Sequence, residues 1–182
     1  MTALLRFDNV TLGRGGRILL ENFDLELRAG EALQVTGPNG SGKSSLIRLA
    51  AGLLKPLRGH VDRCPCALAD DHVALDREQP LRNALRLWVR APDEALDCVG
   101  LLEFSHVPVR LLSSGQLKRA SLARVVASAA PLWLLDEPLN ALDRISAERF
   151  LELLNSHVSG GGLVIIASHQ PVPGPLRKLD LG

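Results

Sequence analysis

Apolar and polar residues follow one another along this chain in patterns that predict strands in some segments and helices in others. Strands are predicted over residues 4–10, 18–27, 31–36, 132–135, 163–167 and 176–181. Helices, with apolar residues at helical spacing, are predicted after Gly42 and over residues 80–89, 92–99, 114–130 and 144–158. Because strands and helices alternate and two of the strands are wholly apolar, the pattern indicates an α/β fold with a mainly parallel sheet.

Composition narrows what such a fold can bind. The chain has 182 residues, about the size of one domain, and 46% of them are hydrophobic. Only 3% are aromatic and none is tyrosine, which disfavours a sheet on which the bases of RNA or single-stranded DNA stack. The net charge of +1 provides no broad basic field for a phosphate backbone. We therefore expect no nucleic acid partner.

The cysteines and the apolar segments bear on the cellular compartment. Three cysteines, an odd number, suit a reducing compartment. Cys64-Pro65-Cys66 is either half of a metal site or a set of small residues on a strand, and the second is favoured because no further ligand pair follows at metal-site spacing. No apolar run approaches the ~18 residues that span a bilayer, and residues 1–6 do not resemble a secretory signal. We expect any membrane role to depend on a partner.

A phosphate-binding motif joins the predicted strand 31–36 to the helix that follows it. Residues 37–44 read G-P-N-G-S-G-K-S, a complete match to G-x-x-x-x-G-K-[ST]. Glycines let backbone N–H groups approach phosphate oxygens, and the helix N-terminus adds partial positive charge. Lys43 is expected to reach the β- and γ-phosphates, and Ser44 to coordinate Mg²⁺. The predicted nucleotide-binding residues are Gly37, Pro38, Asn39, Gly40, Ser41, Gly42, Lys43, Ser44 and Ser45.

Two carboxylates follow the apolar strand 132–135. Asp136 is placed to hold Mg²⁺, directly or through water, as the acidic residue at this point in P-loop enzymes does. Glu137, one residue further on, is a candidate general base for polarising an attacking water. An Asp-Glu-Pro sequence after a strand can be a plain polar loop, but its pairing with a phosphate motif favours the catalytic interpretation.

Three further motifs stand in a fixed order around this pair. Leu112-Ser113-Ser114-Gly115-Gln116 resembles the L-S-G-G-Q signature of ATP-binding-cassette (ABC) ATPases and lies one helix before Asp136. Residues 140–143 resemble the D-loop of that family, although Asp143 is equally suited to cap the next helix. His169 follows the last buried strand, where the family has its switch histidine. In this order the motifs resemble an ABC nucleotide-binding subunit over nearly the whole chain.

The resemblance implies a P-loop NTPase (ABC ATPase) in one domain, 1–182. Such a domain has a mainly parallel core sheet, a small N-terminal antiparallel β subdomain and a short helical subdomain, here at about residues 72–112. The resemblance also implies that ATP and Mg²⁺ are the cofactors, that ATP is hydrolysed to ADP and phosphate, and that Glu137 and His169 are catalytic.

A second copy of the chain is implied as well. In the family two such domains form a head-to-tail homodimer, and the signature of one copy addresses the γ-phosphate held by the other. The residues that would act in this way are Ser113, Ser114, Gly115 and Gln116, with Asp143 in the D-loop. Ser114 stands where the family has glycine, a change that is tolerable if its backbone angles suit a side chain.

The resemblance narrows to one subfamily through residues 107–110, 130–133 and 160–162. These are similar to the ATP-binding subunit of bacterial cytochrome c maturation systems, the haem exporter ATPases. Membership would imply a peripheral place on the cytoplasmic face of the inner membrane, membrane-spanning permease partners, and hydrolysis coupled to haem transport. No residue identifies haem. Another small-cargo exporter, and an ATP-binding regulatory subunit with little turnover, remain as alternatives.

Two departures from the family pattern concern the edges of the site. Many ABC ATPases stack an aromatic residue on adenine from a loop before the phosphate motif, and residues 12–17 contain none. Arg14 or Arg17 can stack a guanidinium plane on the base instead; the alternative is a solvated arginine in a turn. The Q-loop glutamine is also missing. Asp71 and His72 stand in its place, and Gln79 is distant. This change concerns the coupling of hydrolysis to a partner rather than nucleotide binding.

Overall fold

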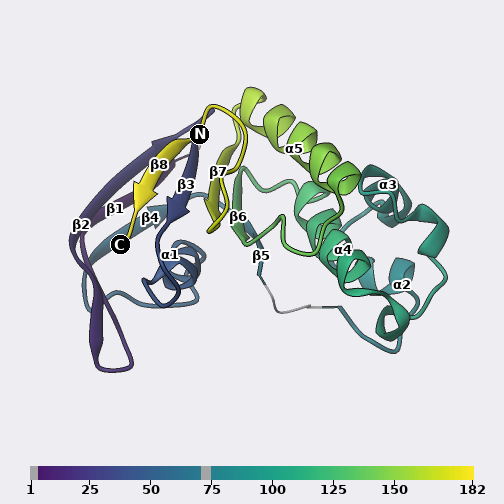
Figure 1. Ribbon diagram of the computed structural model, residues 1–182, viewed down its shortest axis with the longest axis horizontal. Helices are drawn as coiled ribbons and strands as arrows, with labels where there is room; N and C mark the ends of the chain where they lie inside the picture. Colours follow the sequence, from purple (N-terminus) through teal and green to yellow (C-terminus); the bar gives the residue numbers. More distant parts are fainter. Residues whose placement is uncertain (1–3, 71–74) are drawn as a thin grey trace.

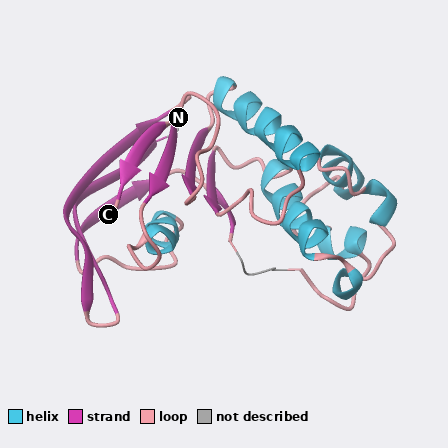
Figure 2. Cartoon of the chain, in the orientation of Figure 1, coloured by secondary structure: helices cyan, strands magenta, loops and turns pink. Residues whose placement is uncertain are grey.

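The computed structural model describes residues 4–70 and 75–182, with the strands gathered on one side and most of the helices on the other (Figures 1 and 2). The strands are β1 (Leu4–Arg14), β2 (Arg17–Arg28), β3 (Ala32–Thr36), β4 (Arg58–Arg63), β5 (Cys66–Ala69), β6 (Leu132–Asp136), β7 (Leu163–Ala167) and β8 (Arg177–Asp180). The helices are α1 (Lys43–Ala50), α2 (Leu81–Leu85), α3 (Pro92–Cys98), α4 (Ser114–Val126) and α5 (Arg144–Ser159), with short 3₁₀ turns η1 (Leu102–Phe104) and η2 (Val109–Leu111). Every strand and helix predicted above is present.

A small antiparallel sheet, in the order β2-β1-β4, forms the N-terminal part of the fold. β1 and β2 make a hairpin whose turn residues, Gly15 and Gly16, have φ of 58° and 78°, the left-handed values that tight hairpin turns require. The sequence pattern did not predict β4. Its residues are almost all polar and exposed, so it has no apolar alternation, and it exists because it pairs with β1, for example Phe7 with Val61.

The larger sheet has the strand order β5-β6-β7-β3-β8, and all four of its pairings are parallel. The predicted α/β fold with a mainly parallel core sheet and a small antiparallel sheet is thus confirmed. β6 and β7 lie inside the sheet and are fully buried along their lengths. Burial on both faces explains why their sequences are continuous apolar runs.

Successive side chains of the parallel strands face two different cores, because side chains on a strand alternate between its faces. Leu132 and Leu134 of β6 pack in one core with α1 and the antiparallel sheet. Trp133 and Leu135 pack in another core with α4 and α5. Figure 1 shows the resulting layers, with α1 on one face of the parallel sheet and α4 and α5 on the other.

A third core lies among α2, α3, the 3₁₀ turns and the first part of α4. Its largest buried side chains include Leu81, Leu85, Leu96 and Leu101. α2 is shorter than the predicted helix over residues 80–89, and it ends at Leu85. This core lies apart from the other two, but the boundary of a helical subdomain at about residues 72–112 stays a prediction.

The parallel sheet brings three loops of the sequence analysis to one edge. β3 leads into the phosphate motif, β6 ends at Asp136, and β7 leads into His169. Because the strands are parallel and adjacent, their carboxyl ends meet at the same edge, where ligands of open α/β sheets bind. Within residues 4–70 and 75–182, no helix has the length and apolar character to cross a membrane.

Candidate nucleotide site

The phosphate loop runs from the end of β3 to the start of α1 and takes its shape from three glycines. Gly37, Gly40 and Gly42 have φ of 138°, 85° and 108°, backbone angles that residues other than glycine rarely adopt. A Cβ on Gly37 would lie 2.7 Å from the Ser41 hydroxyl oxygen, whereas the corresponding side of Gly40 is open. No side chain of the described residues caps α1 at Gly42. Its first N–H groups can therefore approach an anion closely.

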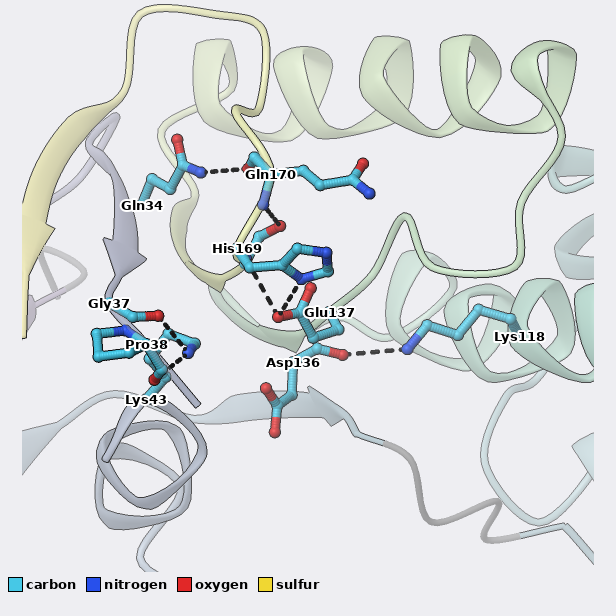
Figure 3. A network of polar contacts seen from close by, with 10 residues as sticks. Gln34, Gly37, Pro38, Lys43, Lys118, Asp136, Glu137, His169 and Gln170 are labelled. Carbon is cyan, nitrogen blue, oxygen red and sulfur yellow. Dashed lines mark hydrogen bonds and ion pairs between the residues drawn. The ribbon is translucent and has the colours of Figure 1, made fainter. Parts of the chain in front are cut away.

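Lys43 lies almost buried beneath this loop. Its ammonium group donates hydrogen bonds of 2.7 Å to the Gly37 carbonyl and 3.0 Å to the Pro38 carbonyl (Figure 3). An ammonium has three N–H donors, so these two contacts orient the group and leave one donor for a phosphate oxygen. The loop carbonyls thus hold the charge of Lys43 at the centre of the loop.

The two carboxylates of β6 share one cavity with the phosphate loop. The cavity has a volume of about 420 Å³, within the usual range for small-molecule sites. It is lined by Arg14, Arg17, Leu19, Asn39, Gly40, Gly42, Lys43, Ser44, Ser45, Asp136 and Glu137. Asp136 is 6% exposed, and its carbonyl accepts a hydrogen bond of 3.0 Å from Lys118 on α4. The structure therefore places the predicted metal residues, Ser44 and Asp136, on the same cavity.

Glu137 and His169 are joined across the ends of β6 and β7. Glu137 has φ of 46°, a strained value for its residue type, and its N–H donates to the Ala167 carbonyl at 2.8 Å. Its Oε1 accepts from the His169 backbone N–H at 3.2 Å and from His169 Nδ1 at 3.0 Å (Figure 3). Since an ionised carboxylate only accepts, Nδ1 carries the proton. Oε2 of Glu137 is buried and has no hydrogen-bond partner among the described residues.

Sequence analysis missed Gln34, which supports the loop bearing His169. Gln34 lies on β3 and is only 1% exposed. Its Nε2 donates to the Gln170 carbonyl at 2.7 Å (Figure 3). Its Oε1 accepts from the Val172 N–H at 3.4 Å. A polar residue inside an otherwise apolar strand was the signal available in the sequence, since buried polar groups almost always have partners.

The signature segment opens α4 and does not line the cavity. Ser113 and Gln116 form a capping box: the Ser113 hydroxyl accepts from the Gln116 N–H at 3.2 Å, and Gln116 Oε1 accepts from the Ser113 N–H at 2.8 Å. Ser114 is the first residue of the helix, a right-handed conformation that any residue adopts. The structure thus meets the condition under which serine can replace the family's glycine.

The D-loop segment packs against the signature segment of the same chain. A Cβ on Gly115 would lie 2.7 Å from the Ala141 carbonyl oxygen, so this approach requires glycine. Asp143 is the N-cap of α5, where its Oδ1 accepts from the Ser146 N–H at 2.7 Å. Hydrogen bonds from the backbone N–H and the side chain of Ser146 lower the pKa of Asp143. Asp143 therefore has the capping role considered above, and its D-loop role stays a prediction.

The remaining sequence predictions fall at the margins of the site. Arg14 and Arg17 both line the cavity, and Arg14 Nη1 donates to the Ser45 hydroxyl at 3.4 Å. Asp71 and His72 lie outside the described residues. Gln79 lies in the segment before α2, where its carbonyl accepts from the Val109 N–H at 3.0 Å.

The structure shows where the three cysteines lie. Cys64, Cys66 and Cys98 are all free, and burial raises the pKa of the Cys66 thiol. Among residues 4–70 and 75–182, no three histidine, cysteine or acidic side chains gather where they could hold a metal ion. Cys64 lies between β4 and β5 rather than on a strand, and Cys66 begins β5.

A phosphate-binding motif at a helix start, and a buried carboxylate at the end of β6, two strands away from β3, form an arrangement that suits hydrolysis of a nucleoside triphosphate. The segment Leu112–Gln116, which does not line this cavity, resembles the signature of ATP-binding cassettes. Residues 20–140 match the family model described as "ABC transporter". The whole chain is 49% identical to the cytochrome c biogenesis ATP-binding export protein CcmA of Sphingopyxis alaskensis, covering 98% of that protein.

Solved structures agree with the fold. A putative ABC transporter ATP-binding protein from Pyrococcus furiosus has a TM-score of 0.84 at 22% identity, over 98% of each chain. A dimeric ATP-binding cassette in a post-hydrolysis state, bound to ADP and Pi, has a TM-score of 0.79 at 24% identity, over 91% of this chain and 88% of that one. The chain belongs to the ABC transporter family and, within it, to the cytochrome c biogenesis ATP-binding export proteins.

Proposed function

We propose that this chain is the ATP-hydrolysing subunit of a transporter that serves cytochrome c biogenesis. The relative from Sphingopyxis alaskensis is named as an ATP-binding export protein of that process, and its likeness covers the whole chain. The single observation that carries hydrolysis is the state of Glu137. One of its carboxylate oxygens is held by His169, and the other is buried beside the phosphate loop without a protein partner among the described residues.

ATP would bind with its phosphates over the start of α1. The N–H groups of the loop surround the β-phosphate, and Lys43 donates to the β- and γ-phosphates. Ser44 and Asp136, hard oxygen donors on the same cavity, fit Mg²⁺, which prefers oxygen ligands. Mg²⁺, when bound, supplies positive charge that neutralises the phosphate oxygens.

Glu137 then acts as general base for the attacking water. The water oxygen bonds to the γ-phosphorus, the bond from that phosphorus to the β–γ bridging oxygen breaks, and Glu137 takes the water proton. The products are ADP and inorganic phosphate. His169 positions Glu137 in this step, because its Nδ1–H and backbone N–H both bind Oε1 and leave Oε2 for the water.

Each complete site would need two chains. Ser113, Ser114, Gly115 and Gln116 do not line the cavity of their own chain, although they form a rigidly capped helix start that suits a phosphate. In a head-to-tail homodimer this helix start faces the γ-phosphate bound by the other copy. One of the solved relatives is itself dimeric.

The transport partners would be membrane-spanning permease subunits of a cytochrome c maturation complex. Haem is the cargo that this process requires. The chain would lie on the cytoplasmic face of the bacterial inner membrane and reach the membrane only through these partners. Purification from native membranes in mild detergent, followed by identification of the co-purifying chains and an absorbance test for haem, checks this part. Recovery of the chain without any membrane-spanning protein would contradict it.

A Glu137→Gln variant tests hydrolysis most directly. The amide keeps the shape but accepts a proton poorly, so we expect ATP binding to persist, steady-state phosphate release to stop, and an ATP-dependent dimer to accumulate in size-exclusion chromatography. Glu148→Gln is the matched control, because Glu148 is an exposed residue that pairs with Arg144 within α5 and does not line the cavity. Turnover at the wild-type rate in Glu137→Gln would remove Glu137 from the mechanism.

A further inference from the structure

The helix that begins with the signature segment contacts the end of β6 in its own chain. Lys118, on the second turn of α4, is partly buried, and its ammonium donates a hydrogen bond of 3.0 Å to the Asp136 carbonyl (Figure 3). Ser114 precedes Lys118 by four residues, so the two lie on the same face of α4, about one turn apart. One turn of helix thus separates the signature segment from a contact with the strand that leads into Glu137.

The carbonyl that Lys118 binds belongs to the peptide group between Asp136 and Glu137. The N–H of the same peptide group donates to the Ala167 carbonyl on β7 at 2.8 Å. Both polar atoms of the group are therefore held, one from α4 and one from β7, and these bonds fix the plane of the peptide. Because φ of Glu137 is the rotation about the next bond along the chain, the two hydrogen bonds help to set the direction in which the Glu137 side chain leaves the backbone.

The backbone of Glu137 depends on such support. Its φ of 46° is a left-handed value, and strained angles of this kind persist only where surrounding contacts hold them. Of the two bonds to the peptide group, the one from the Lys118 ammonium is charge-assisted and therefore the stronger type. It also comes from a helix rather than from a neighbouring strand, so a shift of α4 acts on it directly.

α4 contacts the chain after Glu137 as well. A Cβ on Gly115 would lie 2.7 Å from the Ala141 carbonyl oxygen, and the Asn140 N–H donates to the Glu137 carbonyl at 3.3 Å. Two successive turns of α4 therefore touch residues 136–141, the first at Gly115 and the second at Lys118. A helix attached at two points moves this segment as a unit.

We propose that Lys118 is a positioning residue that transmits the contacts of the signature segment to Glu137 of the same chain. The proposal rests on the proposed function. In the head-to-tail homodimer the signature segment of a chain faces the nucleotide of the partner copy, whereas Glu137 serves the nucleotide on its own phosphate loop. Lys118 thus couples the two nucleotide sites, and ATP in one site orients Glu137 for attack in the other.

Lys118→Met tests the positioning role, because methionine keeps most of the stem and removes the donors. We expect the wild-type affinity for ATP in titration calorimetry and a fall of about tenfold in the maximal rate of phosphate release. Lys118→Arg keeps charged donors and should recover at least about a third of the rate. A wild-type rate in Lys118→Met, or a fall in rate matched by a fall in ATP affinity, would overturn the proposal.

Arg124→Met is the matched control on the same helix. Arg124 Nη2 donates to the Leu68 carbonyl on β5 at 2.6 Å, so this variant also loses a bond between α4 and the sheet, at a peptide group that does not adjoin Glu137. Its Tm should fall while its rate stays within about twofold of the wild type. An equal loss of rate in Arg124→Met and Lys118→Met would show that any loosening of α4 slows the reaction, and would overturn the specific role of Lys118.

Mixed dimers show on which site Lys118 acts. A limiting amount of active chain is mixed, before ATP is added, with a large excess of Glu137→Gln chain, so that nearly every active chain has an inactive partner. Lys118→Met in the active chain should lower its rate about tenfold. The same substitution in the Glu137→Gln partner should have no effect, because the glutamate that it positions is already absent there. The reverse result would place the action of Lys118 on the partner's nucleotide and overturn the proposal.

The coupling itself is measured by changing the excess partner to Lys43→Ala, which we expect not to bind ATP. The active chain then has no nucleotide against its signature segment and should be slower than beside Glu137→Gln. This ratio of rates should be at least about threefold larger for the wild-type active chain than for Lys118→Met; weaker dimerisation affects both and cancels. Equal ratios would overturn the coupling alone. If the wild type does not hydrolyse ATP, or Glu137→Gln still does, the proposed function itself fails.

Discussion

Gln34→Leu removes the buried amide that ties β3 to the loop bearing His169. The leucine keeps roughly the volume of the side chain, and its backbone position in the parallel sheet is unchanged. Two hydrogen bonds are lost, at 2.7 Å to the Gln170 carbonyl and 3.4 Å from the Val172 N–H. These backbone groups then have no side-chain partner on β3, and the loop that places His169 against Glu137 is less constrained.

The expected cost follows from these two bonds. A neutral hydrogen bond contributes about 1 kcal/mol net, and a buried group left unpaired costs about 1–3 kcal/mol. The longer bond is weaker and the leucine gains apolar burial, so we expect a loss of about 2 kcal/mol in unfolding free energy. For a domain of this size that corresponds to a fall in Tm of about 4–8 °C.

Activity should separate a positioning role from a purely structural one. Because the hydrogen bonds of the Gln34 amide go to the loop after His169, and those of Lys43 go to Gly37 and Pro38, ATP affinity should stay at the wild-type value. The rate of phosphate release should fall on the order of tenfold, since a small displacement of a positioning group is enough to misalign the attack. Scanning calorimetry, titration calorimetry and a phosphate-release assay on one preparation give the three values.

Thr36→Val is the matched control on the same strand. The Thr36 hydroxyl donates to the Leu179 carbonyl at 3.4 Å, on the side of β8 rather than toward His169. The Thr36→Val variant should lose no more than about 1 kcal/mol of unfolding free energy and release phosphate at the wild-type rate. A Gln34→Leu protein with normal phosphate release at a lowered Tm would refute the positioning role. A Gln34→Leu protein that also loses ATP affinity would show that the effect spreads to the phosphate loop.

Two further predictions follow from the site and from α5. Phosphate release per chain should rise with protein concentration, because the signature residues lie outside their own cavity; strict proportionality between rate and concentration would contradict the shared site. Stability should fall as the pH drops below about 6.5, because burial lowers the pKa of His157 in the folded chain, so the unfolded chain takes up the proton first. Thermal unfolding of the wild type and His157→Phe between pH 8 and pH 5 measures this, and identical pH slopes would exclude His157 as the cause.

The phosphate loop and the carboxylates of the candidate site could be predicted from sequence because their geometry is local. The phosphate loop is eight consecutive residues whose glycines fix its shape, and Asp136 and Glu137 follow a wholly apolar strand that has to be buried. Neighbouring parallel strands then bring these loop ends together without further information. The same reasoning placed His169 after β7, but it did not predict the two hydrogen bonds that fix Glu137.

What escaped prediction depends on contacts between distant segments. β4 has a polar, exposed sequence and becomes a strand only because β1 offers it an edge. Gln34 acquires its role from a loop 136 residues further along the chain. Likewise, the sequence around Arg14 predicts a turn. Its hydrogen bond to Ser45 becomes visible only in the folded structure, where the hairpin lies against the phosphate loop. In each case the partner, and not the local pattern, decides the structure.

The signature segment also depends on contacts that its local sequence does not reveal. Gly115 lacks a side chain because the Ala141 carbonyl approaches it, and Ser113 is held by its own capping box. These contacts shape a helix start that can receive a phosphate, yet the chain's own phosphate loop does not reach it. A single chain would therefore contribute its phosphate loop to one nucleotide site and its signature segment to another. In the homodimer proposed above, ATP would join the two halves, because the closed state would bind each nucleotide from both sides and the open state from one.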